Sequence, residues 1–325
     1  MPAIMTHDFF GRDILTDRPE LCGGTRTERD AFLLGNQGPD PLFYLVIDPR
    51  MHRMHRFGSL MHNERPTALL QALAASLSVL DEAEKPIGTA YAHGFLCHYL
   101  LDSHMHPLVF SWEYRLCDAG VTGLTRENGS EVHGFIEREL DEMVLFARTG
   151  LSIAEYAPTA HILQADDKTL DTIEKIYAFM ALTVYGQVIR TDLFRTAVHD
   201  FRRVQHMFYS PTGTKRSILA GVEERVRPYS LLRSMAHRPV KLESSWFENR
   251  GRQPWENPFT GRTAAVSFWD IYEQAHSAAV AAIASFDAPG FDGTRARKIT
   301  GDLNFSGEPA PDIEGGMRLS FDLEG

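Results

Sequence analysis

Cysteine is scarce in this sequence, and its three residues, Cys22, Cys97 and Cys117, show no CxxC spacing. An odd number of cysteines without paired spacing favours free, buried thiols over a disulfide framework or a cysteine-ligated metal. Positive charge is also in deficit, because 33 Lys and Arg face 43 Asp and Glu, which gives a formal net charge of -10. Since a long phosphate backbone is held by clustered cations, we expect no nucleic-acid polymer as the main partner.

The sequence also lacks a long apolar run, and a membrane span needs roughly 18 to 20 such residues. The best candidate, residues 95–110, is interrupted by four ionisable side chains: His98, Asp102, His104 and His106. Near the N-terminus, His7 and Asp8 stand where a secretory peptide requires a continuous apolar stretch. We therefore expect a cytoplasmic protein whose contact with a membrane surface is at most transient.

The remaining composition is that of a globular chain, with 43% hydrophobic and 23% charged residues. Apolar residues recur at intervals of three to four over several long segments, which predicts amphipathic helices. These segments are residues 67–83, 87–105, 131–148, 168–187, 189–207 and 263–285. We expect the second of these helices to end before Pro107, because proline disfavours helical geometry in the residue ahead of it.

Alternating, strand-like runs are scarce, so the predicted class is all-α, a multi-helix bundle. No break in composition divides the chain in the middle, and a single helical domain over residues 1–286 is expected. Residues 287–325 are rich in Gly, Asp and Pro, with one alternating stretch at 317–323, and are expected to form an irregular tail. The run GNQGPDP at 35–41 is predicted to be a loop by its turn-forming residues.

Two pairs of a histidine and a carboxylate stand out within the predicted helices. His98 and Asp102 are four residues apart in the most apolar helix, and His133 and Glu137 repeat this spacing. Side chains four apart leave the same face of a helix and can hold one ion. Zinc accepts imidazole and carboxylate ligands, and a hydrolytic zinc site uses about three of them and a water. The two pairs therefore offer two half-sites for zinc.

Each pair also has a simpler interpretation, as a helix cap or a surface ion pair, and His98 with Asp102 could be a buried hydrogen-bonded pair. The apolar surroundings of this first pair favour a metal, because a buried charge must be paired or metal-bound to offset its desolvation. Two further histidines, His62 and His106, lie close by in the sequence and could complete both sets of ligands.

Five motifs in the first 141 residues extend this pattern. They are THxxFG at 6–11, GxQGPDPxF at 35–43, the loop around His62, GFxCHYxLDxxxHP at 94–107 and HxxxExELD at 133–141. In this set and order the chain resembles the zinc-dependent phospholipase C family, particularly its leaderless bacterial branch. Residues after about 150 resemble the family only in their general helical character.

The resemblance implies a helical bundle of the phospholipase C and zinc nuclease type, with two or three zinc ions at one end. Carried over motif by motif, the ligands would form two main groups: Asp40, His62, His98 and Asp102 around one zinc, and His106, His133 and Glu137 around a second. His7 would serve a third zinc, with Asp102 as the bridge.

In extracellular relatives the third ion also takes the free amino end of the mature chain. Here Met1 precedes Pro2, a small residue that permits removal of the initiator methionine. The imine nitrogen of Pro2 is therefore a candidate ligand in place of that amino end.

The function implied by the resemblance is zinc-dependent hydrolysis of a small-molecule or lipid phosphodiester by metal-activated water. Asp40 is the predicted catalytic carboxylate, because it comes from a loop and can bind metal while orienting the nucleophilic water. Its simpler role is that of a turn-forming residue. Two other functions stay open: a helical zinc nuclease or nucleotidase, and a non-catalytic binding protein with a structural zinc site.

Overall fold

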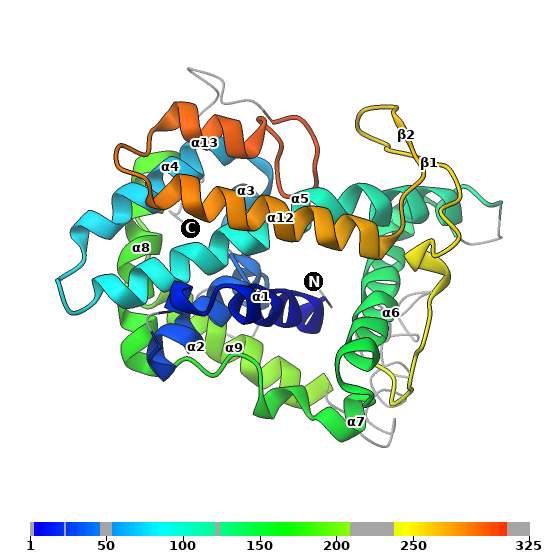
Figure 1. Cartoon of the computed structure of the whole chain (residues 1–325), viewed down its shortest axis with the longest axis horizontal. Helices are drawn as coiled ribbons and strands as arrows, with labels where there is room; N and C mark the ends of the chain where they lie inside the picture. Colours follow the sequence, from blue (N-terminus) through cyan, green and yellow to red (C-terminus); the bar gives the residue numbers. More distant parts are fainter. Residues whose placement is uncertain (1–2, 23, 46–53, 121–123, 209–236, 311–325) are drawn as a thin grey trace, which may run out of the picture.

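The computed structural model describes residues 3–310 except 23, 46–53, 121–123 and 209–236, and helices make up most of it (Figure 1). The α-helices are α1 (Ile4–Asp17), α2 (Arg26–Gly35), α3 (His55–Asn63), α4 (Pro66–Ser76), α5 (Lys85–Cys117), α6 (Gly129–Thr149), α7 (Ile153–Tyr156), α8 (Asp167–Tyr185), α9 (Leu193–Phe208), α12 (Phe268–Asp287) and α13 (Gly293–Thr300). Short 3-10 helices are η1 (Pro19–Cys22), η2 (Asp40–Tyr44), η4 (Leu77–Val79), η5 (Arg126–Asn128), η6 (Pro158–Ala160) and η7 (Trp246–Glu248). Strands β1 (Trp255–Glu256) and β2 (Thr263–Ala264) pair in antiparallel fashion. The predicted all-α class is confirmed.

Helix α5 lies at the centre of the bundle, where α1, α2, α6, α8 and α12 contact it (Figure 1). Every residue from 91 to 103 is buried, as expected for a helix that is apolar around its whole circumference. The buried polar residues His98 and Asp102 on this helix are therefore surrounded by protein on all sides. Within the described part of the chain, no helix combines the length and the apolar character needed to cross a membrane.

The prediction that this central helix ends before Pro107 is wrong, because α5 continues for ten residues beyond it to Cys117. Proline lacks the N–H that would bond to the carbonyl of Ser103 one turn earlier. The turn around Gly307 lies against this position, where a Cβ on Gly307 would come within 2.6 Å of the Ser103 carbonyl oxygen. Tertiary packing thus accommodates the proline, and His106 lies inside the helix rather than after it.

Helices α2 and α5 approach each other closely through two glycines. A Cβ added to Gly94 would lie 2.0 Å from the carbonyl oxygen of Phe32, and one added to Gly35 would lie 2.3 Å from that of Tyr91. Any side chain at either position would therefore push the two helices apart. This contact holds the loop that follows α2 directly against the middle of α5.

The other predicted helices correspond to α4, α6, α8, α9 and α12 with shifted ends, whereas the apolar periodicity predicts neither α1 nor α2. The segment predicted as helix from residue 263 begins with β2, and α12 starts at Phe268 behind its cap Ser267.

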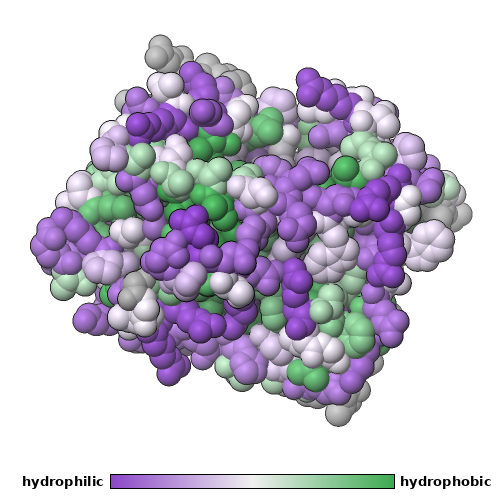
Figure 2. All heavy atoms as spheres, viewed as in Figure 1, coloured by the Kyte–Doolittle hydropathy of each residue, from purple (hydrophilic) through white to green (hydrophobic). Residues whose placement is uncertain are grey.

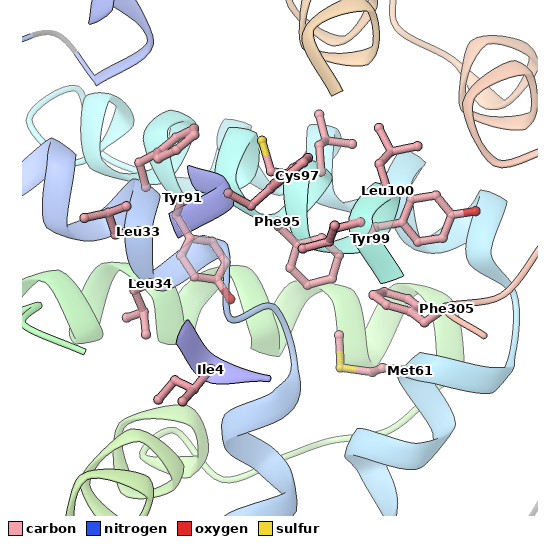
Figure 3. Packing of buried hydrophobic residues seen from close by; sticks show 14 of the residues in the cluster. Ile4, Leu33, Leu34, Met61, Tyr91, Phe95, Cys97, Tyr99, Leu100 and Phe305 are labelled. Carbon is pink, nitrogen blue, oxygen red and sulfur yellow. The ribbon is translucent and has the colours of Figure 1, made fainter. Parts of the chain in front are cut away.

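Apolar side chains of α2 and α5 meet at the core drawn in Figure 3. On the face shown in Figure 2, hydrophilic residues surround smaller hydrophobic areas.

The segment after residue 286 is predicted to be irregular, but its described part contains helix α13 and a buried aromatic residue. Helix α13 packs on α4, and the Phe305 ring, 1% exposed, lies 5.0 Å from that of Tyr99 (Figure 3). The sequence signal is weak because α13 has only eight residues and is mostly polar. Residues 317–323 lie outside the described part.

We predict that Gly94→Ala destabilises the protein while Gly88→Ala, on the same helix, does not. The new methyl at Gly94 meets backbone, whereas at Gly88 its nearest neighbour is the flexible end of Leu80. Overpacking against backbone should lower the free energy of unfolding by about 2 kcal/mol or more, against less than about 1 kcal/mol for the control. Urea unfolding followed by circular dichroism measures both, and equal losses would contradict the close approach.

Candidate metal centre

The eight side chains predicted as zinc ligands converge from five elements of the fold. They are His7 on α1, Asp40 on η2, His62 on α3, His98, Asp102 and His106 on α5, and His133 and Glu137 on α6. Six of the eight are buried, and His106 and His133 are half-buried. Their ligand atoms form three groups, and within each group all atoms lie within 4.8 Å of one another. Two of these groups share His98, and the third consists of His106, His133 and Glu137. The structure thus brings all eight predicted residues together.

The first group is built around Asp40, where the loop after α2 enters η2. Its Oδ1 lies 3.0 Å from Nε2 of His62 and 3.8 Å from Nε2 of His98. Gly38 allows this loop to lie against α5, because it has a φ of +49° and a Cβ there would fall 2.2 Å from the His98 ring. The predicted loop at 35–41 therefore places a carboxylate directly over a histidine of the central helix.

Asp102 connects this first group to the rest of the centre. Its Oδ2 lies 3.3 Å from Nε2 of His98, one turn earlier on α5. Its Oδ1 lies 3.1 Å from Nε2 of His7 and 3.9 Å from Nε2 of His106. One buried carboxylate thus faces three imidazoles, a position that suits a bridging ligand.

The second group lies where α5 and α6 meet. Oε1 of Glu137 is 3.2 Å from Nε2 of His106 and 3.3 Å from Nε2 of His133. Because His98, Asp102 and His106 follow one another at intervals of four, they occupy one face of α5 and run from the first group to the second. The two groups are neighbours along this face.

Four of the histidines are fixed through Nδ1, one by a carbonyl of its own helix and three by acceptors from other segments. The pairs are His62 with Gly58 O (2.7 Å), His98 with Asn36 O (3.1 Å), His106 with Phe305 O (2.8 Å) and His133 with Glu113 Oε2 (2.9 Å). A carbonyl or carboxylate oxygen can only accept, so Nδ1 must carry the hydrogen in each pair. In the neutral ring the lone pair is then on Nε2, the atom that points at the carboxylates.

This arrangement fits a bound metal. A neutral Nε2 and a carboxylate oxygen are both acceptors, so they repel each other at these distances unless a proton or a cation lies between them. Nε2 of His98 is fully buried and makes no hydrogen bond within the described structure. Histidines whose second nitrogen donates to a carbonyl or carboxylate are the usual ligands of zinc. The donor set of imidazole nitrogen and carboxylate oxygen also suits zinc.

In the protein without metal, burial and the neighbouring charges shift the pKa values of these side chains in opposite directions. Burial disfavours the charged form of His106, but Asp102 and Glu137 outweigh it and raise its pKa to about 9. For His98 burial prevails and lowers the pKa to about 4. Burial disfavours the charged form of Asp102 as well, yet the histidines around it hold its pKa far below the usual range. The carboxylates therefore stay ionised and attract a cation.

Asp141 holds the start of α1, and with it His7, against α6. It is fully buried, and its Oδ1 accepts hydrogen bonds from the backbone N–H (2.6 Å) and the hydroxyl (2.7 Å) of Thr6. Its Oδ2 accepts from the N–H of Met5 (3.2 Å) and pairs with Nε2 of His237 (2.8 Å). Because Asp141 lies one turn after Glu137, it fixes α1 relative to the second group.

Sequence reasoning missed Glu113, Asp141 and Phe305 as supports of the centre. Both acids are buried in the fold, but charged neighbours such as Arg115 and Glu142 stand beside them in the sequence, so the local sequence does not single them out. Phe305 acts through its backbone, because its carbonyl accepts from His106 and its N–H donates to His62 O at 3.1 Å. A backbone contact of this kind leaves no mark in the sequence.

Two other histidines in or near the motif do not join the centre. Nδ1 of His104 is hydrogen-bonded to Leu100 O (2.8 Å) one turn earlier, which leaves His106 as the ligand that the motif predicts. His93 pairs with Asp287 (2.7 Å) on α12 instead of supporting a ligand. Pro2, the candidate ligand at the chain start, lies outside the described residues.

Comparisons with known proteins do not assign this chain to a family. No protein-family model, no curated protein and no solved structure gives a significant match to the chain. The functional interpretation therefore rests on the residues of the centre and on their arrangement.

We predict that Glu113→Gln weakens zinc binding at the second group by about 10- to 100-fold. Gln keeps the size of the side chain but removes the charge that holds Nδ1–H of His133. The control is Glu131→Gln, two residues before His133 on α6. Titration of the metal-free proteins against a zinc-competing chelator dye measures both affinities. Unchanged zinc affinity in Glu113→Gln would contradict a supporting role for this carboxylate.

We also predict that zinc binding near pH 7 releases protons. With a pKa of about 9, His106 carries a proton in the metal-free protein at this pH and must lose it to ligate zinc. Calorimetry in buffers of different ionisation enthalpy counts the protons released. His106→Ala should lower the count by about one per chain, whereas His104→Ala should leave it unchanged. An equal count in wild type and His106→Ala would show that His106 is not a ligand.

Proposed function

We propose that this protein is a zinc-dependent hydrolase that cleaves a phosphodiester, and that its bundle is of the phospholipase C and zinc nuclease type. The single observation that supports this most strongly is the pair of neighbouring ligand groups joined by Asp102. Its carboxylate lies 3.3 Å from His98 of the first group and 3.9 Å from His106 of the second. A structural zinc site needs only four ligands around one ion, so eight converging ligands favour a centre with two or more ions.

The chain's own residues divide into zinc ligands and one proposed base. Asp40, His62, His98 and Asp102 would hold one ion, His106, His133 and Glu137 a second, and His7 with Asp102 a third. Bound zinc would lower the pKa of a coordinated water and neutralise charge on the phosphoryl group. The supporting acceptors keep each imidazole in the tautomer that binds metal.

Asp40 is the carboxylate that we assign to orient the attacking water. Its Oδ1 faces His62 and His98, and its pKa lies below the usual value because His62 and His98 outweigh the effect of burial. It is therefore ionised and can accept a proton through Oδ2. Unlike the ligands on α5, it lies on a short 3-10 helix after a loop, and its side chain is 10% exposed.

The proposed substrate is a small-molecule or lipid phosphodiester. The net charge of -10 disfavours a long polyanion, while a nucleotide or a lipid head group carries only one or two charges. A helical zinc nuclease or nucleotidase would use the same chemistry on a different leaving group. Substrate comparison therefore has to separate these possibilities.

The test is metal analysis of the purified protein followed by assays on four substrates: bis(p-nitrophenyl) phosphate, a dinucleotide, single-stranded DNA and phospholipid vesicles. We expect about two or three zinc ions per chain, hydrolysis of the small diester or the lipid, loss of activity with chelator and its recovery with added zinc. Zinc-loaded protein that hydrolyses none of the four substrates would overturn the enzyme assignment in favour of a structural site. Preferential cleavage of DNA would overturn the substrate class.

We predict that Asp40→Asn lowers kcat by about 100-fold or more while the two groups still bind zinc. Asn keeps an oxygen for the metal but cannot take a proton from water. The control is Asp118→Asn, an exposed residue 56% accessible at the end of α5. Activity and zinc content are measured on the same samples. Full turnover with unchanged zinc content would exclude Asp40 as the base.

A further inference from the structure

A cavity lies beside the first turn of α1, between the connection from α7 to α8 and helix α9. It is a cavity of about 370 Å³ within the described structure, a volume typical of a small-molecule site. Its wall contains Ile4 of α1, residues 158–159 and 162–166 of the connection, and Arg202, Gln205 and His206 of α9. The eight residues of the metal centre are absent from this wall, so the cavity is a separate feature.

Arg202 carries the permanent positive charge of this cavity, and His206 is the other basic side chain in its wall. It is half-buried, and the hydrogen bonds of its side chain go to backbone oxygens, from Nε to Leu163 O (2.8 Å) and from Nη2 to Ala165 O. Among the described residues no carboxylate forms an ion pair with it. Burial without such a partner lowers its pKa, which shows that the neighbours do not fully compensate the charge.

The acid in the cavity wall, Asp166, and the acid that acts on the Arg202 charge, Asp167, both have other partners. Asp166 caps α8, where its Oδ1 accepts the N–H (2.8 Å) and the hydroxyl (2.7 Å) of Thr169. Asp167 pairs with Nε2 of His199 at 3.0 Å. A guanidinium with N–H groups to spare is thus left facing the hollow, and an anion from solution would supply the missing acceptor.

The charge and the wall together indicate the kind of anion. Asp166 also lines the cavity, so a dianion such as a phosphate monoester would meet repulsion that a single negative charge avoids. Apolar side chains, including Ile4 and Ile162, which are 3% and 4% exposed, form another part of the wall. Such a wall suits a short hydrocarbon chain.

We propose that this cavity binds a small organic monocarboxylate, with its carboxylate on Arg202 and its apolar chain against Ile4 and Ile162. This site is independent of the proposed hydrolase function. Polar groups of Thr159 and Gln205 also line the cavity and can donate further hydrogen bonds to the carboxylate. Ile4 lies one turn before His7 on α1, so the bound ligand would border the metal centre without contributing to it.

The test is calorimetric titration of the zinc-loaded, full-length protein with hexanoate, hexanol and inorganic phosphate. We expect one hexanoate per chain with a dissociation constant of about 1 mM or lower, and at least tenfold weaker binding of the other two. Zinc content is measured before and after each titration, so that loss of metal to the ligand is detected. Equal binding of hexanoate and hexanol, or the absence of saturation by hexanoate, would overturn the proposal.

Variants separate this cavity from the metal centre, which could also attract a carboxylate. Arg202→Gln should weaken hexanoate binding by tenfold or more, because it removes the charged donor. Its control is Arg203→Gln, the adjacent residue on α9, which is 68% exposed and paired with Asp200. Unchanged affinity in a zinc-loaded Arg202→Gln protein would place the ligand elsewhere and overturn the proposal.

Arg202 also binds the backbone of Leu163 and Ala165, so Arg202→Gln could weaken binding by loosening this loop. A cavity-filling variant avoids this problem. Thr159→Phe leaves Arg202 in place and puts a ring into the hollow, so it should weaken hexanoate binding to a similar degree. Thermal unfolding of each variant shows whether the fold is retained. A folded Thr159→Phe protein that binds hexanoate as tightly as wild type would exclude this cavity. Neither readout depends on hydrolysis, so failure here leaves the phosphodiesterase proposal untouched.

Discussion

The buried carboxylate of Asp102 faces imidazole nitrogens from two helices, and the rest of the centre is organised around that contact. His98 and His106 lie on either side of it on α5, while His7 reaches it from α1. A buried anion surrounded by ring nitrogens is stable only if protons or cations lie between them. The fold is therefore stable only with positive charge beside Asp102. Two or more zinc ions would supply this charge without protonation of the histidines.

The need for a cation beside Asp102 explains why several surrounding groups fix the orientation of the imidazole rings. Each of four histidines donates from Nδ1 to a fixed acceptor, which for His62 is Gly58 on the same helix and for His106 is Phe305 near the end of the described chain. These anchors select one tautomer and restrict ring rotation, which lowers the entropic cost of binding a metal. Asp141 serves the same purpose for α1, because it holds the backbone that carries His7. The centre is thus pre-organised by groups that would not themselves contact a bound ion.

The packing of α2 on α5 matters to the centre as well as to the core. Gly35 and Gly94 allow backbone to meet backbone, and the loop that leaves α2 then places Asn36 and Asp40 over His98. A larger separation of the two helices would remove both an anchor and a ligand. Stability and site geometry are coupled here through two residues without side chains.

Sequence alone determined the helical class and the histidine–carboxylate pairs, because both depend on local periodicity. Residues four apart share a helix face whatever the rest of the chain does, so the spacing by itself pairs His98 with Asp102 and His133 with Glu137. The motif around Pro107 selected His106, which the structure places beside His133 and Glu137, although the helix was expected to stop there.

Only the tertiary structure decided that α5 runs through Pro107, that Phe305 and Glu113 support the ligands, and that a cavity adjoins Arg202. These features depend on contacts between residues up to about 200 positions apart, such as His106 with Phe305. Nothing in the local sequence encodes such contacts, because they arise from the way whole helices pack. The pairs were therefore predictable, whereas their convergence into one centre was a property of the fold.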